Sequence, residues 1–100
     1  MDAAAAPRPD GLPALTEVVD PRRGSVRVSG DLTVQGADLL RGTVECLRRD
    51  GHAVVRVDLG DVRTADAAGL QDLRALERAV AEDGGELLLL SPPAVPTPRR

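Results

Sequence analysis

Residues 53–70, which read AVVRVDLGDVRTADAAGL, decide the fold of this chain. The first seven are almost continuously apolar, which predicts a central strand with both faces covered. Residues 60–65 then predict an acidic turn, and Asp66 is a suitable N-cap for a helix over residues 67–82. A strand that leads into a helix through a tight polar turn is where α/β proteins commonly place functional residues. The turn offers Thr64 and Asp66, but two alanines follow, so no nucleophile stands at its tip.

The segments around this stretch predict a small α/β domain. Strands are expected over residues 14–19 and 25–29, joined by a Pro/Gly turn into a β-hairpin, and over the leucine run 86–90. Apolar residues three and four apart predict a helix over residues 35–49, after a connection at residues 30–36. The order β-β-α-β-α-β with right-handed crossovers gives a mixed β-sheet. Its first strand is antiparallel at one edge, and the helices pack on the sheet.

The chain is long enough for one domain, which is expected over residues 13–91. Residues 1–12 are rich in Ala and Pro and are expected to be disordered. Residues 92–100 are Pro-rich and are expected to form a C-terminal tail.

The composition argues against several classes of function. The 13 basic residues are all arginines, spread along a chain with net charge -3 and no aromatic residue, so we expect no nucleic-acid binding. One cysteine, no signal peptide and no membrane-length apolar segment are typical of a cytoplasmic protein. The sequence has no phosphate-binding glycine loop, nucleophile–base pair or metal-ligand spacing. We therefore expect no enzymatic activity, cofactor or metal.

Four segments carry a family resemblance: GDLT at residues 30–33, VDLGDV at 57–62, DAAGL at 66–70 and GGELLLL at 84–90. Their order and spacing over residues 26–90 resemble the STAS domain of bacterial anti-sigma factor antagonists. The resemblance implies partner switching: the unphosphorylated antagonist binds an anti-sigma factor, which is also a serine-protein kinase, and so frees the sigma factor for transcription. The family continues into a further helix after the last strand. Since this chain turns Pro-rich there, it resembles a version truncated at the C-terminus.

The resemblance also places a recognition site at the start of the second helix. The family motif there is Asp-Ser-Ser-Gly-Leu, and the kinase phosphorylates its first serine. Asp66 matches the aspartate, whereas Ala67 and Ala68 stand where the serines would be, so the phosphorylation site is lost at Ala67. Thr33 stands where the family has the aspartate of Gly-Glu-Leu-Asp. The residues expected to contact the partner are Asp31, Thr33, Thr64, Asp66, Ala67, Ala68, Gly69 and Leu70.

Three alternatives stay open at the level of sequence. Thr64 is the nearest hydroxyl that could accept phosphate in place of Ala67, although a loop hydroxyl bonded to nearby backbone is the plainer interpretation. The chain could instead be a structural subunit of a larger transport or stress-sensing assembly. An uncovered apolar edge at residues 86–90 would favour a homodimer or a fixed partner.

Overall fold

The computed structural model describes residues 15–92 and has the predicted order of strands and helices. Two elements, α2 (Ala67–Glu82) and β4 (Glu86–Leu90), have the predicted bounds. The others are β1 (Thr16–Asp20), β2 (Ser25–Leu32), α1 (Val34–Arg49) and β3 (Val54–Ala65). The disordered segment expected at residues 1–12 lies outside the described residues, as does the tail beyond Pro92.

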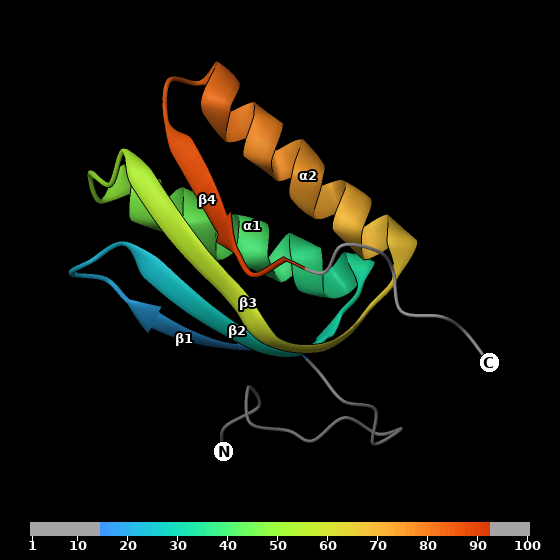
Figure 1. The fold of residues 1–100 in the computed structure, drawn as a ribbon. Helices are drawn as coiled ribbons and strands as arrows, with labels where there is room; N and C mark the ends of the chain where they lie inside the picture. Colours follow the sequence, from blue (N-terminus) through green and yellow to red (C-terminus); the bar gives the residue numbers. More distant parts are fainter. Residues whose placement is uncertain (1–14, 93–100) are drawn as a thin grey trace, which may run out of the picture.

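The four strands form one mixed sheet in the order β1-β2-β3-β4 (Figure 1). β1 and β2 form an antiparallel hairpin, while β2, β3 and β4 run parallel to one another. At the hairpin turn, the backbone N–H of Gly24 donates to Asp20 O over 3.0 Å, and its φ of 66° suits glycine. The imidazole of His52 packs against this turn, with Nε2 2.6 Å from Pro21 O. This topology confirms the predicted α/β fold with an antiparallel first strand at the edge.

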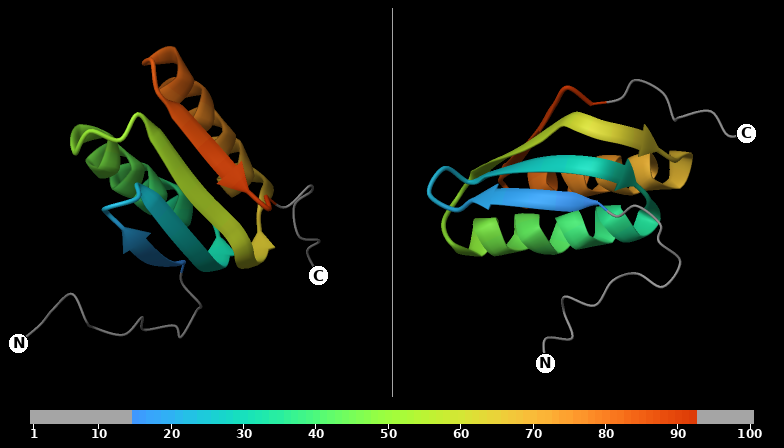
Figure 2. Two further views of the ribbon diagram at one scale, coloured as in Figure 1. Left: turned by 60° about the vertical axis from the view of Figure 1, so that its left-hand side comes forward. Right: turned by 90° about the horizontal axis from the view of Figure 1, so that it is seen from below.

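Both helices pack on the same face of the sheet and leave the other face open (Figures 1 and 2). In β3, Val55, Val57 and Leu59 are buried beneath the helices, whereas Arg56 is exposed on the opposite face. The prediction that this strand is covered on both faces is therefore wrong. From Val55 to Leu59 the strand alternates between apolar and polar residues, as expected where one face meets water.

The predicted turn over residues 60–65 is also wrong, because β3 continues through it to Ala65. The connection predicted over residues 30–36 is also too long, because β2 extends to Leu32. The two extensions pair with each other, with register shifts on either side of the glycine at residue 30. Such irregularities let strands stay paired through residues that disfavour regular β-structure.

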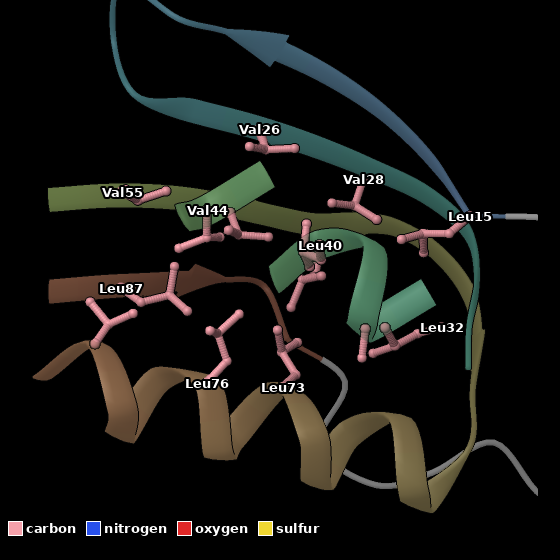
Figure 3. Packing of buried hydrophobic residues seen from close by; sticks show 14 of the residues in the cluster. Leu15, Val26, Val28, Leu32, Leu40, Val44, Val55, Leu73, Leu76 and Leu87 are labelled. Carbon is pink, nitrogen blue, oxygen red and sulfur yellow. The ribbon is translucent and has the colours of Figure 1, made fainter. Parts of the chain in front are cut away.

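The core lies between the sheet and the two helices (Figure 3). Val28 and Val55 from the sheet meet Leu40 of α1 and Leu73 of α2, and each of these side chains is at most 1% exposed. All the buried hydrophobic side chains in the described residues are Leu, Val or Ala, consistent with a chain that has no aromatic residue. Burying each Leu or Val contributes about 1.5–3 kcal/mol to folding, so this core is what fixes the helices on the sheet.

Candidate functional site

Both helices begin at the same end of the sheet, where β2 and β3 finish (Figure 1). The hydroxyl of Thr33 caps α1 by accepting the backbone N–H of Gly36 over 3.1 Å. Asp66 caps α2 as predicted, since its Oδ1 accepts the backbone N–H of Gly69 over 2.6 Å. The N–H of Asp66 also donates to Leu32 O over 3.0 Å. These bonds join the two helix starts into one local structure.

Gly69 holds this region together because it leaves room for a close backbone approach. A Cβ atom at this position would lie 2.9 Å from Leu32 O and 2.9 Å from the carbonyl carbon of Thr33. Both atoms belong to the backbone, so neither can rotate away. A side chain at residue 69 would therefore push the start of α2 away from the start of α1.

The outer surface at the start of α2 is formed by Ala67 and Ala68, which are both exposed. Leu70 turns inward and packs, half-buried, against the core. Neither alanine has a hydroxyl, so neither can carry a phosphoryl group. The surface offers small methyl groups beside the positive end of the helix dipole.

A second polar cluster lies beside the helix starts, at the paired ends of β2 and β3. Asp31 lies opposite Thr64 in the strand register, and the Thr64 hydroxyl donates to Asp31 Oδ1 over 2.6 Å. Arg63 Nη2 lies 3.8 Å from the same carboxylate oxygen. Thr64 is thus a strand residue bonded to a carboxylate, rather than the loop hydroxyl bonded to backbone that the sequence favours. Sequence reasoning missed Arg63, because its place beside Asp31 depends on strand pairing.

A match to a protein-family model identifies the family of this chain, and the match covers all the described residues. Residues 15–98 match the family model described as "Mlab, STAS domain". The chain belongs to the STAS domain family. The resemblance of the quoted segments to STAS domains is therefore confirmed at the level of the family.

Three solved structures share the fold at low sequence identity. The anti-sigma factor antagonist SpoIIAA in its unphosphorylated form aligns with a TM-score of 0.57 at 17% identity, over 80% of this chain and 74% of that chain. The STAS domain of an antisigma-factor antagonist from Rhodobacter sphaeroides gives 0.56 at 17% identity, over 81% and 88%. The crystal structure of Mglu gives 0.61 at 20% identity over 71% of this chain, which spans 18% of the Mglu chain. No protein with a curated description matches the sequence.

The STAS fold gathers all the predicted contact residues at one end of the domain. Asp31 and Thr33 lie at the end of β2 and the start of α1, and Thr64 and Asp66 at the end of β3. Residues 67–70 form the first turn of α2. The glycine and leucine of this turn face inward, so they shape the surface from beneath rather than forming part of it.

The part of the chain that the structure describes, residues 15–92, contains no group of three or more His, Cys, Asp or Glu side chains placed to hold a metal ion. None of its helices combines the length and the apolar character that crossing a membrane requires.

Proposed function

We propose that this STAS domain is a protein-binding module of the anti-sigma factor antagonist type, which regulates transcription by partner switching in the cytoplasm. Its partner would be an anti-sigma factor of the serine-protein kinase type. The observation that carries the proposal is the joined start of the two helices, where Asp66 caps α2 and Gly69 lets α2 approach Thr33. The role is non-catalytic and uses no cofactor or metal.

The chemistry of this surface favours a protein partner. Ala67 and Ala68 are exposed and small, so the main chain of a partner can approach the helix closely. Asp31 adds a carboxylate that Thr64 and Arg63 hold in a fixed position. A surface of exposed backbone and short side chains suits a protein better than a small molecule, which usually occupies an enclosed cleft.

The proposed binding does not depend on phosphorylation at the usual position. A phosphoserine there would add about -1.5 to -2 charges at pH 7, but Ala67 has no hydroxyl to carry one. Thr64 is a poor substitute, because its hydroxyl already donates to Asp31 over 2.6 Å. A phosphate on Thr64 would lie against the Asp31 carboxylate and be repelled by it. We therefore propose constitutive binding that is controlled by the amount of the protein.

Ala67→Asp tests the surface by placing a negative charge where other family members carry phosphate. An acidic residue is well tolerated in the first turn of a helix, so we expect the variant to fold. Ala75→Asp is the matched control, because Ala75 is another exposed alanine further along α2. The assay is isothermal titration calorimetry with a kinase-type anti-sigma factor encoded near this gene.

We expect Ala67→Asp to weaken binding by about tenfold or more and Ala75→Asp by less than about twofold. Ala67→Ser, offered to the same kinase with ATP, should become phosphorylated and then lose affinity. Equal losses for the two aspartate variants, or full affinity for Ala67→Asp, would place the partner on another surface. No binding by the wild-type chain to any such kinase would reject the antagonist role itself.

A second candidate is a structural subunit of a larger transport or stress-sensing assembly. It is favoured by the description of the matching family model, which names Mlab rather than an antagonist. The same surface would then hold the chain in a permanent complex, and the alanines at residues 67 and 68 would suit binding that is never switched. The two candidate functions can be distinguished by purifying the tagged chain with its stoichiometric partner and identifying that partner by mass spectrometry. Transport components would indicate the structural subunit, and an anti-sigma kinase would indicate the antagonist.

A further inference from the structure

Strand β4 forms one edge of the sheet and pairs only with β3 among the described strands (Figure 1). Its five residues pair in an unbroken parallel register, without the irregularities of the β2–β3 pair. It contains four leucines and no Pro, Lys or Arg. Natural sheets usually protect their edges with such residues, with bulges or with a covering segment. β4 therefore has the features of a strand that pairs with another chain.

One hydrogen bond shows which backbone groups of β4 point out of the sheet edge. The backbone N–H of Glu86 donates to Ala53 O over 2.8 Å, so this residue faces β3. Since backbone groups alternate along a strand, Leu88 and Leu90 also face β3. Leu87 and Leu89 then direct both their N–H and C=O groups out of the edge.

We propose that β4 is a homodimer interface, in which it pairs antiparallel with β4 of a second copy about a two-fold axis at Leu88. In this register Leu87 of each copy exchanges two hydrogen bonds with Leu89 of the other. All the outward backbone groups of these residues are satisfied, and the two sheets join into one. The inference is independent of the proposed function, which uses the ends of β2 and β3 and the first turn of α2 rather than β4.

The side chains also favour a second copy as the occupant. The register sets Leu88 opposite Leu88 and sets each Glu86 opposite Leu90 of the other copy, so no carboxylates face each other. On α2, Asp72, Leu76 and Ala79 lie on the side that faces α1. Arg74 and Glu77 are therefore on the opposite flank of the helix, above the β4 edge. These two form an ion pair of 3.2 Å within one copy. An antiparallel α2 of the second copy would present the same charges in reverse order, so the two flanks are complementary.

The other edge of the sheet, β1, carries a charged side chain that points inward. Glu17 lies on this strand, and its Oε1 accepts the hydroxyl of Thr43 in α1 over 2.6 Å. An inward-pointing charged residue is one of the features by which natural sheets protect an edge from pairing with another chain. The domain should therefore form dimers through β4, not chains through both edges.

Sedimentation velocity over the micromolar to submillimolar range tests the interface with the full chain. We expect the wild type to pass from the monomer mass of 10.5 kDa to twice that mass as concentration rises. Leu88→Lys and Leu88→Glu should each weaken dimerisation by about tenfold or more, because like charges then meet at the axis. An equimolar mixture of the two should restore dimers. Val18→Lys is the control, because Val18 is 66% exposed and lies on β1.

A second pair of variants changes an exposed residue, because substitutions there should not prevent the domain from folding. Leu90 is 41% exposed and faces Glu86 of the second copy in the proposed register. Leu90→Lys should therefore dimerise at least about tenfold more tightly than Leu90→Glu. The proposal is overturned if the wild type stays monomeric throughout, if the two Leu90 variants dimerise equally, or if Val18→Lys dissociates the dimer as Leu88→Lys does. Circular dichroism confirms that each variant is folded.

Discussion

The backbone of residues 32 and 33 approaches Gly69 closely. Replacing Gly69 with alanine, which adds one methyl group, therefore tests how tightly the two helix starts pack. In Gly69→Ala the new Cβ would meet Leu32 O and the Thr33 carbonyl carbon at 2.9 Å, and Asp66 Oδ1 at 3.0 Å. Ordinary contacts begin at about 3.4 Å, so the first turn of α2 must retreat by about 0.5 Å. That movement stretches the cap on α2 and the bond from Asp66 N to Leu32 O.

Two opposing effects decide the size of the change in stability. Alanine is favoured over glycine within a helix by about 0.8–1.0 kcal/mol, which would stabilise the variant. Inserting a methyl group into a closely packed site costs about 1–3 kcal/mol, and here the neighbours are backbone atoms that cannot repack. We therefore expect Gly69→Ala to lose up to about 2 kcal/mol of unfolding free energy. In a domain of this size, the melting temperature falls by about 4–8 °C for each kcal/mol.

Gly42→Ala is the matched control, because it makes the same chemical change within α1. A Cβ at Gly42 has nothing within 4 Å, so only the helix preference remains. This variant should gain up to about 1 kcal/mol. Both are measured by urea denaturation followed by circular dichroism. If Gly69→Ala were as stable as Gly42→Ala, the close packing of the two helix starts would not constrain residue 69, and the reasoning would fail.

Three further substitutions test the fold. Asp66→Ala removes the cap that α2 receives from Oδ1 and should cost about 1 kcal/mol in urea denaturation. Leu73→Ala removes a side chain that is 1% exposed and should cost about 2–5 kcal/mol, seen as a large fall in melting temperature. Asp83→Asn breaks a 2.9 Å ion pair with Arg48 whose aspartate is 77% exposed. It should therefore cost less than about 1 kcal/mol, and less still in thermal melts at high salt.

The helices could be predicted from sequence because their boundaries are set by local signals. Asp66 and the Asp83-Gly84 pair bracket α2, and its predicted bounds are those observed. The end of α1 at Asp50 and Gly51 follows the same rule, with φ of 106° at the glycine. A cap or a left-handed glycine acts within a few residues, so one sequence contains the information.

The strand ends could not be predicted in this way, since their extent depends on pairing with a distant segment. Gly30 and Gly60 are residues that favour turns when each segment is considered alone. In the structure they lie within β2 and β3, which pair as far as Leu32 and Ala65. The alternation of Arg56 with the valines on either side is a local signal for a one-sided strand, whereas the overall apolar character of the segment favours a strand covered on both faces.

Because β2 and β3 pair as far as Leu32 and Ala65, the candidate site lies on regular secondary structure rather than on a turn. A recognition turn would hold Thr64 and Asp31 on mobile connections, and binding would have to order them at an entropic cost. Here both residues lie in paired strands and share a hydrogen bond of 2.6 Å, while Asp66 and Thr33 are fixed as helix caps. The candidate site is therefore held in place by the domain itself, before the proposed partner binds. Affinity can then come from a small contact of short side chains and backbone, because little of it is spent on ordering the domain.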